Sequence, residues 1–427
     1  MINITYADGR QEIELLGQLK KRSAETDAKV TQVVSDIIEN VKTNGDNAAL
    51  GYTKKFDGTI PQKLKYSKDE LKQFIEKCDP EFIDALERAA KNIEEYHKMQ
   101  KQNGFVNTRP DGVILGQRVR ALKRAGIYVP GGTAAYPSSV LMNAIPAKIA
   151  GVEEIIMVTP PSKTGSENNE ILAAAFIAGV DCVYMVGGAQ AVAALAYGTE
   201  TIPKVDKIVG PGNIYVATAK KLLYGVVDID MIAGPSEILI IADHTANPKF
   251  LAADLMSQAE HDVLASSILV TTDKEIAKAT VKELEIQVER LSRKEIIQKA
   301  LADFGAIIVC DSLDKAFEIA NEVAPEHLEI CVENPLEYIG RADNAGSVFL
   351  GNYSPEALGD YYAGPNHVLP TSGTARFFSP LSVDSFIKKS SFIYYPEKAL
   401  KAAAKDIVNI ALQEGLTAHA NSVEVRL

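Results

Sequence analysis

A glutamate and a histidine, Glu326 and His327, are adjacent in the segment Ala324-Pro325-Glu326-His327-Leu328-Glu329. Neighbouring side chains diverge, so the two residues are expected to face different parts of one pocket as separate proton carriers. Imidazole titrates near neutrality and a partly buried carboxyl group can be raised towards it, so both suit general acid–base catalysis. The alternative is that Pro325 ends a helix and both residues cap the next element at the surface.

The positions of the other histidines favour the first interpretation. The chain has six histidines. His97, in a polar helical stretch, is expected to be exposed to solvent, and His244, in a turn after an apolar strand, to be structural. The remaining four each have a Glu, Asp, Gln or Asn close by: His261, His327, His367 and His419. This grouping in the C-terminal part predicts a metal site or an acid–base site.

Further oxygen-bearing residues lie at suggestive positions. Gln258 and His261 are three residues apart, so on a helix they share a face and can present an oxygen and a nitrogen to one ion, or else form a polar helix end. Asp360 precedes two tyrosines and a polar loop that contains His367. Imidazole, carboxylate and amide oxygen together suit zinc, or manganese as a substitute. His419 lies in a tail that either folds back or reaches a partner subunit.

Composition limits the classes of partner. Lys and Arg total 45 against 56 acidic residues, a net charge of −11, which argues against nucleic acid as a bulk partner. We expect no transmembrane helix and no signal peptide. The four cysteines are scattered, without a Cys-x-x-Cys pair, so a reduced, cytoplasmic protein is expected. A chain of 427 residues is expected to form at least two large domains.

Strand and helix patterns alternate in two series, which predicts an α/β fold of two doubly wound units with parallel sheets. A short arm and a mainly helical scaffold come first, up to about residue 102. The first series of strands is expected at 126–130, 155–158, 182–186 and 207–209, and the second at 238–241, 268–270, 306–309 and 328–332. Connecting helices are expected at about 249–260, 273–302 and 312–323, and the tail at 397–413 as a helix followed by an extended end at 422–427.

Small residues follow three of the expected strands, in the segments Pro130–Thr133, Gly187–Gln190 and Gly210–Asn213. In doubly wound sheets ligands bind beyond the carboxyl ends of the strands, and glycine at a helix N-terminus lets an anion approach the backbone. A complete Gly-x-Gly-x-x-Gly pattern is absent, so a dinucleotide is allowed but tight turns explain the glycines equally well. Ser236 either binds substrate or caps a turn, and it lacks the context of a serine hydrolase nucleophile.

The motifs together resemble the histidinol dehydrogenase family. The segments that carry the resemblance are Gly210–Asn213, Ala233–Glu237, Ser257–His261, Pro325–Glu329, Gly364–Thr371 and Leu416–His419. They extend over nearly the whole chain. The resemblance implies two incomplete Rossmann-like units with small N- and C-terminal arm domains. The implied domains are residues 1–22 (N-terminal arm), 23–127 with 236–380 (a discontinuous domain with metal and catalytic residues), 128–235 (NAD-binding) and 381–427 (a tail that intertwines a dimer).

The family oxidises L-histidinol to L-histidine with two NAD through an aldehyde that stays bound, in the last two steps of histidine biosynthesis. The resemblance implies one zinc ion per subunit, with the ligands Gln258, His261, Asp360 and His419. It implies substrate contacts from these four residues and from Ser236, Glu326, His327, His367 and Glu414. Glu414 and His419 would come from the other subunit of a homodimer. It implies NAD contacts from Tyr128, Gln190 and Asn213.

These roles fit the residue types. His327 would take the alcohol proton, Glu326 would activate the water that adds to the aldehyde, and zinc would act as a template for the substrate. Covalent catalysis through a thiol is not expected, because Cys331 and Cys182 lie in apolar strand patterns. The competing hypotheses are a zinc hydrolase that needs no NAD, a non-catalytic protein that binds a metal and an amino acid, and a dehydrogenase of other amino alcohols or sulfonates.

Overall fold

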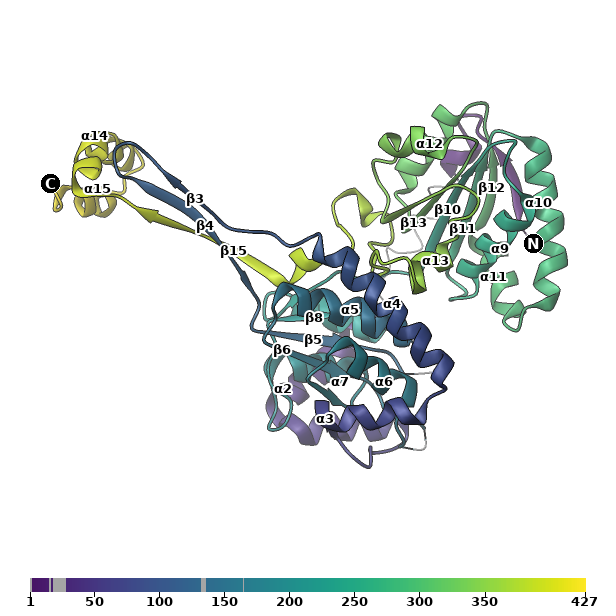
Figure 1. Ribbon diagram of the computed structural model, residues 1–427, viewed down its shortest axis with the longest axis horizontal. Coiled ribbons are helices and arrows are strands. Elements are labelled where there is room, and N and C mark those ends of the chain that lie inside the picture. Colours follow the sequence, from purple (N-terminus) through teal and green to yellow (C-terminus); the bar gives the residue numbers. More distant parts are fainter. Residues whose placement is uncertain (1, 15–16, 18–27, 132–135, 164) are drawn as a thin grey trace. The chain divides into compact units, whose positions relative to one another are not determined.

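The computed structural model describes residues 2–14, 17, 28–131, 136–163 and 165–427. The chain forms two compact units (Figure 1). The first unit comprises Met1–Gln100 and Leu122–Phe386, and the second comprises Lys101–Ala121 and Ile387–Leu427. Parts of the expected N-terminal arm (1, 15–16 and 18–22) and residues 132–133 of the segment Pro130–Thr133 lie outside the described residues. Within the described residues, no helix is both long and apolar enough to cross a membrane.

Sheet 1 of the first unit is six-stranded, in the order β1-β12-β11-β10-β13-β14, and every neighbouring pair is parallel. Its strands are β1 (Asn3–Tyr6), β10 (Glu237–Ala242), β11 (Ser266–Thr271), β12 (Gly305–Val309), β13 (His327–Cys331) and β14 (Ser347–Leu350). Its helices are α9 (Pro248–Ala259), α10 (Lys274–Gln287), α11 (Lys294–Phe304), α12 (Leu313–Val323) and α13 (Glu356–Tyr361).

Alternation of apolar side chains along the strands builds a core on each face of sheet 1. Ile238 and Ile240 of β10 pack with residues of α9, α10 and α11 on one face. Leu239 and Ile241, which point the other way, pack with residues of α12. Both faces are therefore covered, as expected for a parallel sheet, which leaves the ends of its strands for contact with a ligand.

Sheet 2 has the order β2-β7-β6-β5-β8-β9, and of its described strands β2 alone is antiparallel to its neighbour. Its strands are β2 (Lys65–Ser67), β5 (Arg124–Tyr128), β6 (Glu154–Val158), β7 (Cys182–Tyr184), β8 (Lys207–Val209) and β9 (Asp228–Ile229). Its helices are α2 (Ala28–Asp57), α3 (Lys68–Leu71), α4 (Pro80–Lys98), α5 (Pro137–Ala150), α6 (Asn169–Ala178), α7 (Gly188–Tyr197) and α8 (Ile214–Leu223). The cores lie under α4, α5 and α6 on one face and under α2, α7 and α8 on the other.

The prediction of two doubly wound α/β units is confirmed, and the expected strands of both series form within a few residues of their predicted places. The expected domain limits differ from the topology. The limit between residues 127 and 128 falls inside β5, and β2, which the prediction grouped with sheet 1, pairs with β7 of sheet 2. Within the expected N-terminal arm, Asn3–Tyr6 form β1, which pairs in parallel with β12 along its whole length.

Two local features of the first hundred residues concern helix formation. A capping box forms at the start of α3, where Glu70 Oε2 accepts from Ser67 N at 2.9 Å. His97, predicted to be exposed, is fully buried. It follows Ile93 by four residues, so it lies on the apolar face of α4, and its Nδ1–H donates to Ile93 O at 2.8 Å. The helical position, not the polar character of the neighbouring sequence, decides its burial.

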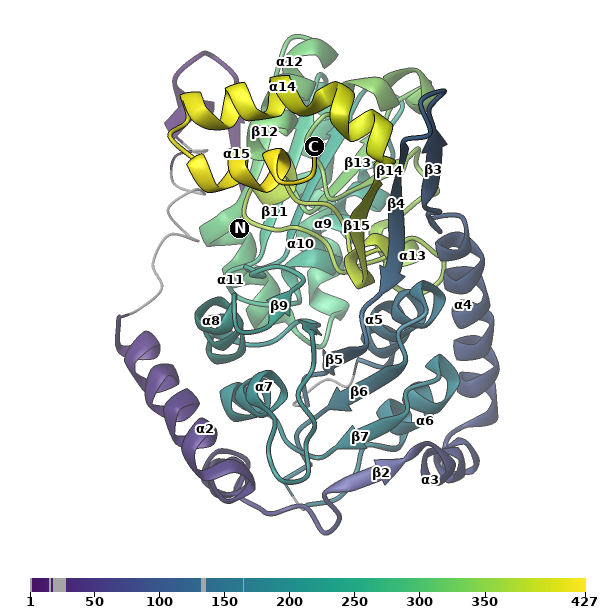
Figure 2. The same cartoon turned by 90° about the vertical axis from the view of Figure 1, so that its left-hand side faces the viewer.

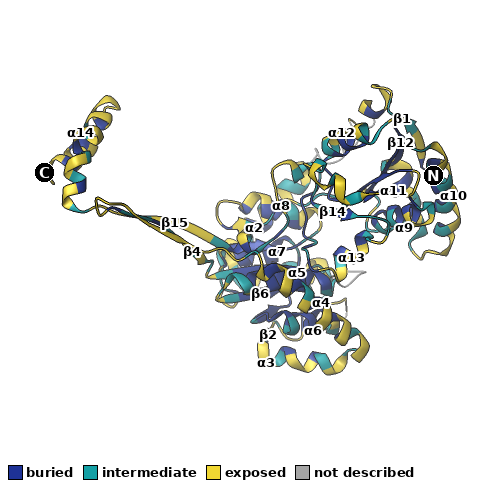
Figure 3. Cartoon of the chain, turned by 45° about the horizontal axis from the view of Figure 1, so that its top comes forward, coloured by how far each residue is buried: buried dark blue, intermediate teal, exposed yellow. Residues whose placement is uncertain are grey.

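The second unit is a three-stranded antiparallel sheet followed by two helices (Figure 2). Its elements are β3 (Phe105–Thr108), β4 (Ile114–Ala121), β15 (Ile387–Tyr394), α14 (Glu397–Gln413) and α15 (Thr417–Glu424). Its sheet is largely exposed on the surface of the chain (Figure 3). The predicted extended end at 422–427 is wrong, because α15 runs to Glu424 and Arg426 N donates to Val423 O. Val423 and Val425 alternate with polar residues as in a strand, but this pattern is short. Burial of Ala420 and Val423 on one side of α15 favours the helix instead.

Candidate functional site

Glu326 and His327 are buried at the amino end of β13 in sheet 1. One residue of the neighbouring strand fixes both of them. Glu237 N donates to Glu326 Oε2 at 2.9 Å, and Glu237 O lies 3.1 Å from His327 Nδ1. A carbonyl oxygen can only accept, so Nδ1 carries the proton of the neutral ring, and Nε2 is left as the basic nitrogen. The predicted acid–base pair is thus built as two separately oriented groups, and the alternative of surface caps is wrong.

Asp360, near the end of α13, lies between two histidines. Its Oδ1 is 3.8 Å from His327 Nε2 and 3.7 Å from His367 Nδ1. His367 Nδ1–H donates to Asp360 O at 3.0 Å, so Nε2 of His367 can accept from Ser139 Oγ, 3.3 Å away. The structure therefore brings His327, Asp360 and His367 together, as the sequence predicted.

The end of α9 contributes the remaining predicted ligands of this unit. Gln258 lies in the last turn, where its Nε2 is 3.5 Å from Glu326 Oε2. Its Oε1 is buried and has no hydrogen-bond partner within the described part of the chain. His261 lies just beyond the helix, and its N donates to Gln258 O at 3.2 Å. Because carbonyl groups at a helix C-terminus carry partial negative charge, this end of α9 favours a cation.

The sequence missed one member of the cluster, Glu356. A ligating atom from each of His261, Glu356 and Asp360 lies within 4.8 Å of the other two. Glu356 is buried, and its Oε1 is 4.0 Å from His327 Nε2. The available signal was its position one helical turn before Asp360, which places both carboxylates on one face of α13.

The surrounding carboxylates and burial set the protonation of the site. Burial raises the pKa of Glu326 to about 7. Burial lowers the pKa of His327, but the charge of Glu326 and the carboxylates of Asp360 and Glu356 outweigh it and raise that pKa to about 10. Burial also lowers the pKa of His261 and of His367, which keeps both rings neutral and able to act as ligands or hydrogen-bond acceptors. The pocket thus concentrates negative charge and favours a bound cation.

The predicted NAD contacts lie at the carboxyl ends of strands in sheet 2. Asn213 caps α8, and its Oδ1 accepts from Tyr215 N at 3.0 Å. Tyr128 ends β5, and its hydroxyl accepts from Gly188 N at 3.1 Å. Gln190, in the first turn of α7, is buried, and neither its Oε1 nor its Nε2 has a hydrogen-bond partner within the described residues. A buried amide without partners is suited to a ligand that supplies them.

A pocket of about 340 Å³ is lined by the predicted metal and acid–base residues and by one of the predicted NAD contacts, Asn213. Loops from both sheets line it, including Gly210–Asn213 and the predicted site residues Ser236, Gln258, His261, Glu326, His327, Asp360 and His367. Tyr128 and Gln190 lie beside the glycine segment at 187–188 and do not line it. The structure thus gathers seven predicted substrate or metal residues and Asn213 around one cavity.

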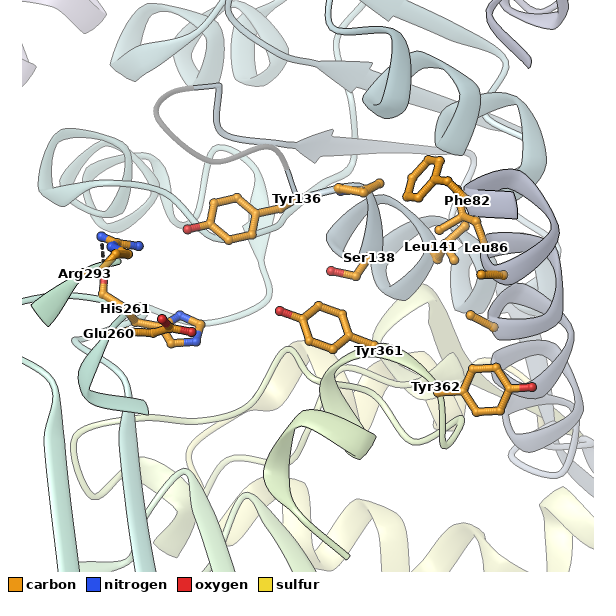
Figure 4. A pocket seen from close by; sticks show the side chains of 13 residues that line it. Phe82, Leu86, Tyr136, Ser138, Leu141, Glu260, His261, Arg293, Tyr361 and Tyr362 are labelled. Atoms are coloured by element: carbon orange, nitrogen blue, oxygen red, sulfur yellow. Dashed lines mark hydrogen bonds between the residues drawn. The ribbon is translucent and has the colours of Figure 1, made fainter. Parts of the chain in front are cut away.

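A second cavity of about 440 Å³ shares His261, Tyr136, Ser138 and Tyr361 with this pocket (Figure 4). Apolar side chains of α4 and α5, such as Phe82 and Leu141, form one side of it, as Figure 4 shows. Glu260, His261 and Arg293 form the opposite side, where Arg293 donates to His261 O at 3.5 Å. His261 therefore lines both cavities.

Glu414 and His419 belong to the second unit. Glu414 follows α14 as its C-terminal cap, and His419 is in the first turn of α15. Both side chains are exposed. The structure of a single chain therefore shows them accessible for an interaction, and their predicted roles in the site stay a prediction.

The residues of the first unit fit a metal ion. Imidazole, carboxylate and amide oxygen are zinc ligands, and the unpaired Oε1 of Gln258 is an oxygen that a cation would satisfy. The buried acid–base pair beside this cluster, at the ends of strands in doubly wound sheets, defines an α/β enzyme. Thiols are not part of it, since Cys331 is buried within β13 and burial raises its pKa.

Comparison with known proteins gives the family. A family model described as histidinol dehydrogenase matches residues 20–427. The chain is 64% identical over 408 residues to histidinol dehydrogenase of Clostridium acetobutylicum, which covers 96% of this chain and 95% of that protein. It is 56% identical over 414 residues to the enzyme of Listeria monocytogenes, with 97% of each covered. The crystal structure of histidinol dehydrogenase from Elizabethkingia anophelis superimposes with a TM-score of 0.92 at 42% identity, over 99% of this chain and 97% of that one.

The chain therefore belongs to the histidinol dehydrogenase family and is an oxidoreductase. The predicted resemblance is confirmed over nearly the whole length of the chain.

Proposed function

We propose that this protein oxidises L-histidinol to L-histidine through bound L-histidinal, using zinc and two NAD, in the last two steps of histidine biosynthesis in the cytoplasm. The observation that carries the proposal is the pair Glu326 and His327, both oriented by Glu237 next to the unpaired oxygen of Gln258. Two oxidations at one carbon require two proton transfers and one water addition, and this pair supplies a separate group for each kind of step.

His327 acts as the base in both oxidations. Its Nδ1–H is engaged by the carbonyl of Glu237, so Nε2 receives the alcohol proton when the carbon loses a hydride. Glu326 acts on water. Its Oε2 is held by Glu237 N, and the carboxylate takes a proton from the water that adds to the aldehyde. The hydrated aldehyde then loses its second hydride, and His327 again takes the hydroxyl proton, which leaves the carboxylic acid.

The cofactors supply what these side chains lack. NAD would accept one hydride in each oxidation, with contacts from Tyr128, Gln190 and Asn213. Zinc, when bound, would supply two positive charges that orient the nitrogen atoms of the substrate and lower the pKa of the neighbouring His327. Gln258, His261 and Asp360 would hold the ion, one per subunit, and Ser236 and His367 would contact the substrate.

The second unit completes the site in a homodimer. We propose that Glu414 and His419 reach the pocket of a second copy of the chain, His419 as a zinc ligand and Glu414 as a substrate contact. Both side chains are exposed and therefore available to a second copy of the chain. The partners are thus a second copy of the chain and a small molecule, without nucleic acid or membrane.

The activity is tested by incubating the purified protein with L-histidinol and zinc, with and without NAD, and identifying the products by chromatography. Histidine formed only with NAD supports the proposal. Turnover of an amide or ester substrate without NAD would favour a zinc hydrolase, and oxidation of other amino alcohols but not histidinol would change the substrate.

The shared site is tested by mixing two inactive variants, His261→Asn and His419→Asn, under conditions that allow subunits to exchange. A mixed dimer has one site with both substitutions and one intact site, so random mixing should restore about a quarter of the wild-type activity. No recovery, with exchange shown independently by mass spectrometry, would place His419 in the site of its own chain or in none.

A further inference from the structure

Glu329 is a buried acid for which the proposed mechanism has no use. It follows His327 by two residues on β13, so both side chains point to the same face of sheet 1. Its neighbours Leu328 and Ile330 are apolar, and Glu329 is itself only 1% exposed. A position in the middle of a covered parallel strand ordinarily holds an apolar residue. A carboxyl group there is costly unless polar partners compensate for its burial.

The first partner is the backbone of α13. Glu329 Oε1 accepts from Glu356 N at 2.9 Å. Glu356 is the first residue of α13, and Asp360 lies one turn further along the same helix. The bond therefore fixes the start of the helix that carries Asp360, and without it a buried N–H would have no acceptor.

Asp254 of α9 also lies near Glu329. Burial together with the charge of Asp254 raises the pKa of Glu329 well above its ordinary value, and Oε2 of Glu329 is buried without a hydrogen-bond partner within the described residues. Asp254 lies one helical turn before Gln258. Ser257 adds a further link, because its Oγ is 2.8 Å from Asp254 O and 3.0 Å from Glu356 Oε2.

We propose that Glu329 is a positioning residue, which holds the start of α13, and with it Asp360, at the place where Asp360 and Gln258 can bind one metal ion. It acts by accepting from the backbone of α13, and it is not one of the proposed ligands. The inference rests on the proposed function, because the metal ligands are themselves part of that proposal. If Glu329 had a purely structural role, the volume of its side chain would matter. In a positioning role, its ability to accept a hydrogen bond from Glu356 N matters instead.

The test compares two substitutions of Glu329. Glu329→Gln keeps an oxygen that can accept from Glu356 N, whereas Glu329→Leu has similar volume and no acceptor. Zinc affinity is measured on the metal-free proteins by competition with a chromophoric chelator, and the melting temperature is measured in parallel. We expect Glu329→Leu to bind zinc roughly 10- to 100-fold more weakly and Glu329→Gln to stay within about threefold of wild type.

Leu328→Ala is the matched control. Leu328 is the preceding residue of β13, is fully buried, and packs in the core on the opposite face of the sheet. It should lower the melting temperature while zinc affinity stays within about threefold of wild type. Should Glu329→Leu fail to fold, Ser257→Ala removes the other link between α9 and Glu356, and it should weaken zinc roughly three- to tenfold.

Four results would overturn the inference. Unchanged zinc affinity in Glu329→Leu, or in Ser257→Ala where that variant replaces it, removes the positioning role. Equal loss in Glu329→Gln and Glu329→Leu shows that charge matters instead of the hydrogen bonds. Equal loss in Leu328→Ala shows that general destabilisation is the cause. A wild-type protein that binds no zinc overturns the proposed function, and this inference with it.

Discussion

The two sheets of the first unit line the same pocket with opposite ends of their strands. Sheet 2 presents carboxyl ends, where β8 leads through Gly210–Asn213 into the N-terminus of α8. Sheet 1 presents amino ends, where His327 begins β13 and α9 arrives with its C-terminus. Helix N-termini carry partial positive charge and suit phosphate groups, whereas helix C-termini carry partial negative charge and suit cations. One kind of unit, used in two orientations, can therefore serve an anionic cofactor and a metal ion.

The two ends also differ in the groups that they offer. Sheet 2 contributes mainly backbone at glycine, held from behind by Lys220, whose Nζ donates to Gly210 O at 3.0 Å. Sheet 1 contributes buried, individually paired side chains such as Glu326 and His327. The comparison predicts that substitutions at the amino ends of sheet 1 abolish chemistry or metal binding, whereas those at the carboxyl ends of sheet 2 weaken cofactor binding.

The largest effect is expected from His261→Asn. The substitution removes the proposed imidazole ligand at the C-terminus of α9, so zinc and activity should be lost together, with activity falling more than about 100-fold. Zinc per subunit is measured by elemental analysis after dialysis. His244→Asn is the control, because His244 is exposed in a turn. A His261→Asn protein with a full complement of zinc would contradict the ligand assignment.

Glu326→Gln should slow the aldehyde step by roughly 10²- to 10³-fold, because the amide cannot take a proton from water. Oxidation of L-histidinal, supplied as substrate, should be impaired more strongly than the first oxidation of L-histidinol, as resolved by rapid mixing. Glu333→Gln, at an exposed position, is the control. Equal and unchanged rates for both steps would remove the water-activating role of Glu326.

Gly210→Ala examines the carboxyl end of sheet 2. Gly210 has φ +112°, and an added Cβ would lie 2.1 Å from Tyr128 O. Gly225→Ala is a matched control, because Gly225 has φ +99° and open space around the added atom. Gly210→Ala should raise KM for NAD by roughly tenfold, equivalent to about 1.4 kcal/mol, with zinc content unchanged. An equal rise in Gly225→Ala would assign the effect to backbone strain alone.

The last effect is a pH dependence of stability in the metal-free protein, which concerns folding and not catalysis. The folded pKa of His327, about 10, exceeds its unfolded value of 6.5. The stabilisation is therefore complete below pH 6.5 and is lost as pH rises through about 10, by roughly 1 to 3 kcal/mol. Urea unfolding between these pH values measures it. His327→Gln should flatten the dependence, and a metal-free wild type that gains stability over this range would show that the site does not favour a cation.

Sequence patterns were sufficient for the sheets and for most side chains of the pocket. The strands of both series are short apolar runs. Such strands must be covered on both faces, whatever the order in which they are connected. The sequence did not show that β13 brings His327 to the pocket with its amino end, because the general expectation places ligands at carboxyl ends. Which end of a sheet faces a shared pocket depends on long-range packing, which local periodicity does not encode.

Buried polar residues were the second failure. In the sequence, Glu356 looks like an ordinary charged residue of a short helix, and Glu329 looks like an interruption of an apolar strand. Their roles follow from contacts with residues that are distant in sequence, such as Glu329 with Asp254 and Glu356 with His327. The wrong prediction for His97 was avoidable, because the spacing of four residues between Ile93 and His97 places both on the apolar face of α4.

The most direct test of the whole account is the number of NADH molecules formed per L-histidinol consumed, with zinc present, after chelation, and after zinc is restored. The proposed arrangement, with NAD and zinc at opposed sheet ends around one acid–base pair, predicts two NADH per substrate, no turnover after chelation, and recovery with zinc. One NADH per substrate would mean that the aldehyde is released after a single oxidation. Undiminished turnover after complete removal of the metal would contradict the role given to the amino end of sheet 1.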